Sequence, residues 1–182
     1  MSTLWLASGS PRRRTLLEWC GFEVQVHPPD VDEYPRPDEA PIALAERLAK
    51  LKVATAPDGV LAVAADTLVH RDGLLFHKPR DRQDACRILA DLSERWHHVT
   101  TGFAVRRDAR IHVEHTTTRV RFRALTGVEI EAYVATGEAD DKAGAYGIQG
   151  RAAAFVAEVQ GSWTNVVGLP IEAILPVIRE MA

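Results

Sequence analysis

The sequence has few features of a membrane or secreted protein. It contains no apolar run long enough to span a bilayer, and its first residues lack the apolar core of a signal peptide. Cysteine is scarce, since only Cys20 and Cys86 are present, and their spacing is not that of a zinc site. We therefore expect a cytoplasmic protein without membrane partners and with two buried, reduced thiols. A disulfide between the two is the alternative.

Two common nucleotide-binding motifs are also missing. The sequence has no Walker A motif, which argues against a P-loop ATPase, and no Gly-x-Gly-x-x-Gly turn after an apolar strand. The formal net charge is −3, and the aromatic residues, 7% of the chain, are scattered. A nucleic-acid partner would need a basic face with aromatic residues on it, so nucleic acid is not an expected partner.

The composition is that of an ordinary globular protein. The 182 residues, 46% hydrophobic and 26% charged, suit one domain over residues 1–182 with room for two lobes. Apolar periodicity and turn signals predict strands over residues 4–7, 22–26, 60–65, 74–77, 96–105, 111–122 and 155–159. The same signals predict helices over residues 11–20, 41–56, 82–92, 126–136 and 170–178.

The first loop has the features of an anion site. It joins the strand over residues 4–7 to a helix for which Ser10 is a suitable N-cap and Pro11 a suitable first residue. Backbone N–H groups of Ser8 to Ser10 and the helix N-terminus should point toward one place. In that helix Arg13 shares a face with Leu16 and Leu17, so we expect it to reach inward. The alternative is a run of solvated surface arginines.

Two charged residues lie where apolar side chains are expected. Lys52 is in the small-residue face of the helix over residues 41–56, so its ammonium either reaches water past an apolar stem or faces a phosphate. Asp66 follows the continuous apolar run over residues 60–65, and we expect it at the end of a buried strand; the alternative is that residues 68–70 continue this strand. It is either a turn-capping aspartate or a functional carboxylate near a ligand at the strand end.

Further charged residues complete a set suited to phosphoryl chemistry. Glu33 lies in a stiff, proline-rich loop, although a loop glutamate considered alone is most often solvated, and Lys78 is kept out of helix by Pro79. Cations neutralise phosphates, carboxylates hold a divalent metal, and a base orients water. The histidines of one predicted hairpin lack the spacing of a zinc site, so we expect exposed strand histidines: His97, His98, His112 and His115.

The motifs resemble those of the Maf family of nucleoside triphosphate pyrophosphatases. The similar blocks occur in the family's order along nearly the whole chain, at Leu6–Arg13, Ala65–Thr67, Lys78–Asp81, Asp141–Gly150 and Val166–Pro170. The resemblance implies an α/β fold with a central mixed, curved sheet flanked by helices. It also implies two lobes with a cleft between them, an architecture similar to that of the inosine triphosphatase family.

The resemblance also implies an activity and roles for residues. A nucleoside triphosphate would be hydrolysed between its α and β phosphates, giving the monophosphate and pyrophosphate. Glu33 and Asp66 would hold Mg²⁺ or Mn²⁺, and Asp66 would take a proton from the attacking water. The triphosphate would be held by Ser8, Ser10, Arg13, Lys52 and Lys78. A homodimer is compatible with this assignment.

Three positions distinguish subgroups of the family. Arg12, Thr67 and Gln149 resemble the pyrimidine subgroup, which implies dTTP and UTP as substrates, with modified pyrimidine nucleotides as further candidates. The 7-methyl-GTP subgroup has a tryptophan at the first place, where it could stack on a cationic purine, whereas Arg12 would repel one. Thr67 and Gln149 suit the carbonyl and N–H edge that uracil and thymine share.

A regulatory protein is the rival hypothesis, because the family is linked to septum formation during cell division. Such a protein would bind nucleotides without turning them over. Only the enzyme would release pyrophosphate in a metal-dependent way, and a preference for 7-methyl-GTP would leave that assignment intact while changing the subgroup.

Overall fold

The structure of the protein is a computed structural model that describes residues 3–182. Its strands are β1 (Thr3–Leu6), β2 (Glu23–Val26), β3 (Leu61–Arg71), β4 (Leu74–Phe76), β5 (Trp96–Arg107), β6 (Arg110–Phe122) and β7 (Val156–Gln160). The α-helices are α1 (Pro11–Trp19), α2 (Pro41–Val53), α3 (Arg82–Leu92), α4 (Gly127–Val134), α5 (Trp163–Val167) and α6 (Ile171–Met181), and two 3₁₀ turns are η1 (Ala143–Ala145) and η2 (Arg151–Phe155). Over residues 3–182, no helix combines the length and the apolar character needed to cross a membrane.

The strands form a mixed seven-stranded sheet, which confirms the predicted α/β class. Its order is β2-β1-β3-β5-β6-β7, and β4 pairs with β3 beside this path. Strand β1 is parallel to both β2 and β3, whereas β3 with β4 and β6 with β7 are antiparallel. Helices α1 and α2 lie in the connections that lead to β2 and β3, and these connections return the chain to the end of the sheet at which β1 begins, as parallel strands require. Strands β2 and β3 lie on opposite sides of β1.

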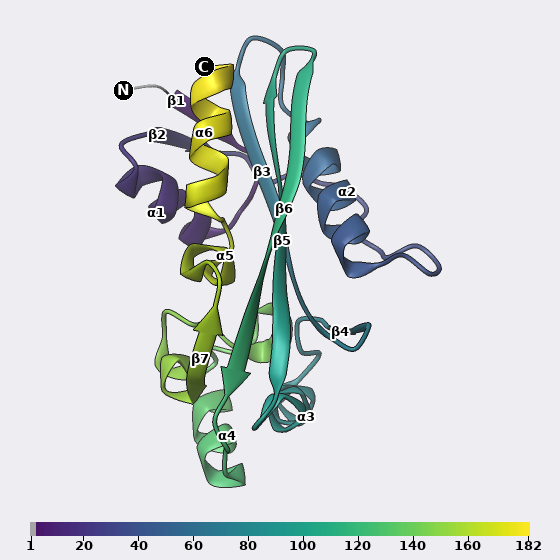
Figure 1. Ribbon diagram of the computed structural model, residues 1–182, viewed down its shortest axis with the longest axis vertical. Helices are drawn as coiled ribbons and strands as arrows, with labels where there is room; N and C mark the ends of the chain where they lie inside the picture. Colours follow the sequence, from purple (N-terminus) through teal and green to yellow (C-terminus); the bar gives the residue numbers. More distant parts are fainter. Residues whose placement is uncertain (1–2) are drawn as a thin grey trace. The chain divides into compact units, whose positions relative to one another are not determined.

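The chain divides into two compact units, in agreement with the predicted two lobes. The first unit contains residues 1–67, 101–116 and 164–182, and the second contains 68–100 and 117–163. In the first unit, α2 lies on one side of the strands, and α1 and α6 lie on the other (Figure 1). Helix α2 approaches β5 closely, because a Cβ atom on Gly102 would lie 2.3 Å from the backbone carbonyl of Ala45.

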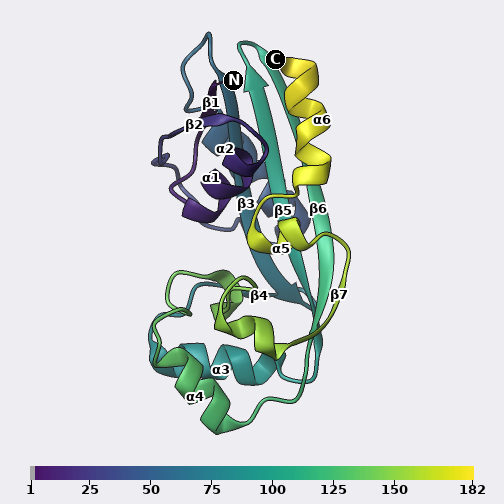
Figure 2. The same cartoon turned by 90° about the vertical axis from the view of Figure 1, so that its left-hand side faces the viewer.

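The second unit has an aromatic core between its strands and helices. The ring of Phe122 meets Tyr146 and Phe155 edge to face, at centroid distances of 4.8 Å and 6.1 Å. Helices α3 and α4 pack side by side (Figure 2). Asp81 caps α3 through a 2.8 Å bond from Asp84 N–H, and Thr126 opens α4 with the predicted capping box.

Three sequence-based expectations are corrected by the structure. Asp66 is not at the end of a strand, because β3 continues to Arg71 by pairing with β4. His97 is fully buried rather than exposed, since Tyr146 covers it and bonds its Nε2 atom at 2.8 Å. Cys20 and Cys86 are free thiols but are half-buried, and helix α5 was not predicted.

Candidate active site

The loop after β1 leads into α1 at the predicted residues. Ser10 is the N-cap of α1, with the extended backbone of that position, and Pro11 follows as the first helical residue, which confirms the predicted start of the helix. The Ser10 side chain makes no capping bond, but Ser10 N–H donates to the buried Ser8 Oγ at 3.2 Å. The loop is thus closed by a bond within it.

Arg13 links three segments of the first unit. Its Nη1 donates to Ser8 Oγ at 2.9 Å, its Nη2 to Thr67 Oγ1 at 3.1 Å, and its Nε to the Gly168 carbonyl at 2.8 Å. The inward orientation predicted for Arg13 is confirmed, whereas Arg14 lies at the surface and pairs with Glu18. Burial lowers the pKa of Arg13, and the negative charge of Asp66 opposes that shift, so the guanidinium keeps its charge.

The Thr67 hydroxyl takes part in several hydrogen bonds. Its Oγ1 accepts from Arg13 Nη2 and lies 2.9 Å from Thr101 Oγ1, a pair in which either hydroxyl can donate. Thr101 Oγ1 also lies 3.1 Å from the Asn165 carbonyl, and Thr67 Oγ1 lies 3.4 Å from the Gly168 carbonyl. Thr67 is therefore held by groups from three other segments of the chain.

Lys52 lies between the two predicted metal-binding carboxylates. Its Nζ atom is 2.5 Å from Asp66 Oδ1 and 2.9 Å from Glu33 Oε1. The Lys52 and Asp66 side chains are only 8% and 10% exposed, whereas that of Glu33 is 53% exposed. One of the two interpretations of Lys52 placed its ammonium in water beyond an apolar stem. The structure instead places the ammonium between two carboxylates. The three residues carry one net negative charge.

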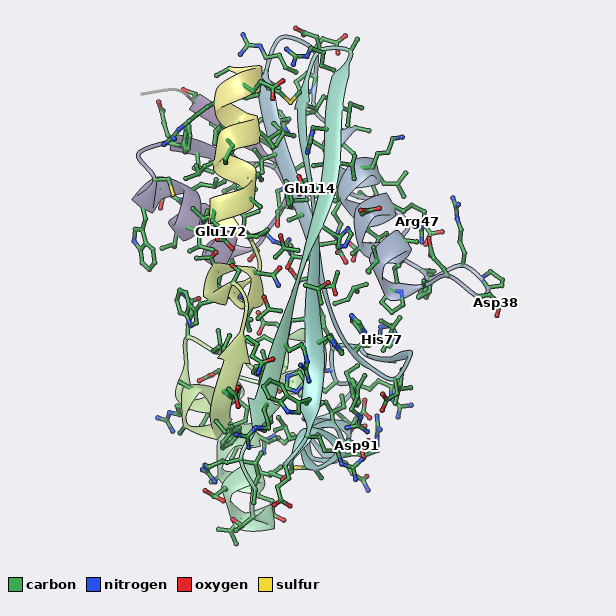
Figure 3. The ribbon with its side chains drawn as sticks, viewed as in Figure 1. Asp38, Arg47, His77, Asp91, Glu114 and Glu172 are labelled. Carbon is green, nitrogen blue, oxygen red and sulfur yellow. The ribbon has the colours of Figure 1, made fainter. Side chains whose placement is uncertain are left out.

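The loop that carries Glu33 is fastened to the same helix as Lys52. Arg47 of α2 donates from Nε to Glu39 Oε1 at 2.6 Å and from Nη2 to the Tyr34 carbonyl at 3.0 Å. The hydrogen bond from the Arg47 side chain, together with one from Arg36 N–H, lowers the pKa of Glu39 to about 2. Figure 3 shows Arg47 on α2 where the loop that contains Asp38 approaches the helix. Glu33 is therefore held in two ways. Lys52 bonds its side chain, and Arg47 bonds the backbone carbonyl of the next residue, Tyr34.

The carboxylates of Glu33 and Asp66 fit a divalent cation bound together with substrate. In the described part of the chain, no three His, Cys, Asp or Glu side chains gather into a group that could hold a metal ion alone. Mg²⁺, however, usually takes one or two carboxylates and completes its shell with phosphate oxygens and water. Two oxygen donors with an excess of one negative charge match that chemistry.

The remaining predicted site residues are divided between the two units. Arg12 is half-buried in the first turn of α1. Lys78 and Gln149 belong to the second unit, and both are exposed. Lys78 follows β4, and Gln149 lies in the glycine-rich loop before η2. The structure thus brings together two groups of predicted site residues. Ser8 and Thr67 both bond Arg13, and the carboxylates of Glu33 and Asp66 both bond Lys52. The two groups are neighbours, because Asp66 directly precedes Thr67.

Sequence reasoning missed the partners of the Arg13 network. The Gly168 carbonyl, Thr101 and Asn165 complete it, and they come from segments far from Arg13 in the chain. Gly168 has a φ of +127°, a conformation that favours glycine. A glycine directly before Leu169-Pro170 was the available signal, but nothing local to that segment indicates which side chain its carbonyl accepts.

The family profile and the curated relatives place the chain in one family. The profile of the family described as "Maf-like protein" matches residues 3–181. A protein of Geobacter metallireducens is 48% identical and one of Chromobacterium violaceum 45% identical, and both are named dTTP/UTP pyrophosphatase. The matches cover 99% of this chain and 96% of the first relative, and 92% and 89% for the second. The solved structure of the Staphylococcus aureus Ham1 protein is 10% identical, with a TM-score of 0.45 over 66% of this chain and 72% of its own.

Proposed function

Because the chain belongs to the family of Maf-like proteins, we propose that it is a pyrophosphatase acting on dTTP and UTP. It would cleave between the α and β phosphates and release the nucleoside monophosphate and pyrophosphate. The observation that carries the proposal is the buried Asp66, paired with Lys52 directly before Thr67 of the Arg13 network. The family profile covers residues of both units, which supports treating the whole chain as one functional domain.

Asp66 is the proposed general base. Its carboxylate is held by Lys52 at 2.5 Å, so its orientation is fixed before substrate arrives. A positioned carboxylate can accept the proton of an attacking water while the new bond to phosphorus forms. The displaced pyrophosphate leaves with the electron pair of the bond that breaks. Lys52, a cation already at the site, would then balance charge on the neighbouring phosphate oxygens.

Cations and the loop before α1 are proposed to hold the triphosphate, although Ser8 N–H and Ser10 N–H already donate within the protein, to the Leu6 carbonyl and to Ser8 Oγ. Ser8 and Ser10 contribute the loop at the start of α1, and Arg12 and Arg13 contribute positive charge beside it. Lys78 is proposed as a further cation from the second unit. Arg13 also acts through its hydrogen bonds, since it fixes the hydroxyls of Ser8 and Thr67. Truncating any of these cations should weaken triphosphate binding more than binding of the monophosphate product.

Glu33 and Asp66 are proposed to bind Mg²⁺ or Mn²⁺ together with the substrate. When bound, the cation would neutralise negative charge on the phosphates as the bond breaks. Lys52 contacts each carboxylate through a single oxygen, so the pair is already oriented when the substrate arrives. Arg47 supports this arrangement by fastening the Glu33 loop to α2.

Thr67 and Gln149 are proposed to read the base. The Thr67 hydroxyl, held by Arg13 and beside Thr101, suits the carbonyl and N–H edge that uracil and thymine share. The Gln149 amide can both donate and accept, which suits the same edge. Arg12 disfavours the cationic base of 7-methyl-GTP. We therefore expect discrimination between UTP and CTP, which differ only in that edge.

The proposal is tested by measuring kcat/KM for dTTP, UTP, CTP and 7-methyl-GTP. Pyrophosphate release is followed with Mg²⁺, with Mn²⁺ and with EDTA. We expect dTTP and UTP to be the best substrates and EDTA to abolish release. Tight nucleotide binding without pyrophosphate release would instead favour a nucleotide-sensing regulatory protein. A preference for 7-methyl-GTP would overturn the base assignment alone.

A further inference from the structure

Gln149 occupies a tight turn in the second unit. Gly150 N–H donates to the Gly147 carbonyl at 3.0 Å, so Ile148 and Gln149 are the two central residues of the turn. The side chain of Ile148 is 7% exposed, whereas Gln149 is exposed. The turn therefore anchors one central side chain in the core and presents the other.

A continuous set of hydrogen bonds joins the two ends of this turn. Gly147 N–H donates to the Tyr133 hydroxyl at 3.3 Å, and that hydroxyl donates to Glu138 Oε1 at 3.1 Å. Glu138 Oε2 accepts from Arg151 N–H at 3.0 Å, directly after the turn. We call the side chains of Tyr133 and Glu138, together with the N–H groups of Gly147 and Arg151, the turn clasp. It connects the first residue of the turn to the residue that follows it.

The glycines of the turn match the side chains of the clasp. A Cβ atom on Gly150 would lie 2.1 Å from Glu138 Oε1, and one on Gly147 would lie 2.8 Å from Lys142 Cε. Lys142 in turn donates to the Glu138 backbone carbonyl at 2.7 Å. Glycine at both ends thus lets Glu138 and Lys142 approach the backbone, which a larger residue would prevent.

The proton positions of the clasp are fixed by its chemistry. Burial and the Glu138 carboxylate raise the pKa of Tyr133, so its phenol stays protonated. A neutral phenol has one proton, and the carboxylate can only accept, so the direction of the Tyr133 to Glu138 bond is set. The free lone pairs of Tyr133 then accept from Gly147, and the clasp has a single consistent arrangement.

We propose that Tyr133 and Glu138 are positioning residues that hold the turn in the conformation in which Gln149 selects the base. The inference rests on the proposed function, in which Gln149 reads the pyrimidine edge. Neither side chain needs to touch the nucleotide, because both act on the backbone on either side of Gln149. Loss of the clasp should therefore lower the discrimination between bases more than it lowers turnover of the preferred substrate.

The test measures kcat/KM for UTP and CTP with Tyr133→Phe and Glu138→Gln, each alone and combined with Gln149→Ala. Tyr133→Phe removes only a hydroxyl, and Glu138→Gln replaces one acceptor oxygen with an amide nitrogen that cannot accept from Arg151 or Tyr133. We expect each single change to lower the UTP to CTP ratio by about tenfold, the scale of one lost hydrogen bond. Added to Gln149→Ala, the same changes should lower the ratio no further.

Glu131→Gln is the matched control, because Glu131 is an exposed carboxylate on the same helix as Tyr133. It should leave the ratio unchanged. A melting temperature for every variant separates loss of selectivity from unfolding. An unchanged ratio in Tyr133→Phe and Glu138→Gln, or an equal further fall in the Gln149→Ala background, would overturn the positioning role.

Amide hydrogen exchange over residues 147–151, measured without nucleotide, tests the clasp apart from the activity. Exchange should become faster in Tyr133→Phe and stay at the wild-type rate in Glu131→Gln. A wild-type protein that releases no pyrophosphate would contradict the proposed function, and the exchange result would still decide whether the clasp holds the turn. A selective wild-type enzyme whose variants keep both selectivity and slow exchange would contradict the clasp alone.

Discussion

The ammonium of Lys52 lies 2.5 Å from Asp66 Oδ1, and both side chains are almost completely buried. A buried ion pair is costly to form, because both charges leave water. Here the pair fixes the carboxylate proposed as the general base. Its second partner, Glu33, comes from an exposed loop, so the pair also joins the interior of the first unit to its surface.

Replacing the base should abolish turnover without unfolding the protein. Asp66→Asn keeps the size of the side chain but cannot accept a proton, and we expect the rate to fall by about a hundredfold or more. Steady-state pyrophosphate release and thermal unfolding are measured together. Asp72→Asn is the control, because Asp72 is 92% exposed in a turn. A rate above about a tenth of wild type would remove Asp66 from this role.

Removing the ammonium should affect both stability and activity. Lys52→Ala leaves Asp66 buried without its partner, a change that typically costs about 3–5 kcal/mol. Alanine favours helix, so the loss would not come from α2 itself. We expect a lower free energy of unfolding in urea and a lower kcat/KM for dTTP. Lys50→Ala, an exposed position on the same helix, should change neither, and wild-type kinetics in Lys52→Ala would contradict a role at the site.

The Arg47–Glu39 pair should contribute to stability in a defined pH range. Because Arg47 lowers the pKa of Glu39 to about 2 from an ordinary value of 4.5, the contribution is present above that ordinary value and is lost as the pH falls toward 2. Arg47→Met should flatten this part of the curve of unfolding free energy against pH. Arg110→Met, which breaks an exposed pair with Glu180, should keep the wild-type slope.

His97 should produce a second, separate pH dependence. Burial lowers its pKa to about 3 from 6.5, so stability is full above the ordinary value and is lost as the pH falls toward 3, when the buried ring must take up a proton. His97→Gln should remove this loss, because glutamine does not titrate and can still bond the Tyr146 hydroxyl. His112→Gln, at a position whose side chain is 43% exposed, should leave the curve unchanged. An identical curve in His97→Gln would contradict the assignment.

Close packing of α2 on β5 predicts a strong effect of one methyl group. Gly102→Ala would place a Cβ atom 2.3 Å from the Ala45 carbonyl, so α2 must move, and Lys52 moves with it. We expect a loss of about 1–3 kcal/mol in unfolding free energy together with reduced kcat. Gly127→Ala is the control, since no atom lies within 4 Å of the added Cβ. Full activity in Gly102→Ala would show that the site tolerates displacement of α2.

Local signals in the sequence were sufficient for most elements. Ser10-Pro11 marked the start of α1, Thr126 and Glu129 marked the start of α4, and the inward side of α1 placed Arg13 correctly. Each of these depends on residues within one or two helical turns. The resemblance to a family supplied the sheet class and the division into two units, which no local pattern contains.

The errors arose where distant contacts decide the outcome. Asp66 lies within β3 because strands that come later in the sequence continue the pairing beyond it. That Ser8 Oγ would accept from both Ser10 N–H and Arg13 depends on the position of Arg13, whose other partners are distant in the sequence. That Lys52 would bond two carboxylates could not be read from the helical stripe, since the stripe gives the face of the helix and not what covers it.

The bond from Arg13 to the Gly168 carbonyl spans 155 positions in the sequence, and this has a consequence for biosynthesis. Synthesis proceeds from the N-terminus, so the first loop leaves the ribosome long before its last partner exists. Until residue 168 has been added, Arg13 lacks one of its three acceptors. The emerging chain therefore cannot complete the Arg13 network, and we expect the proposed activity only after nearly the whole polypeptide has been made.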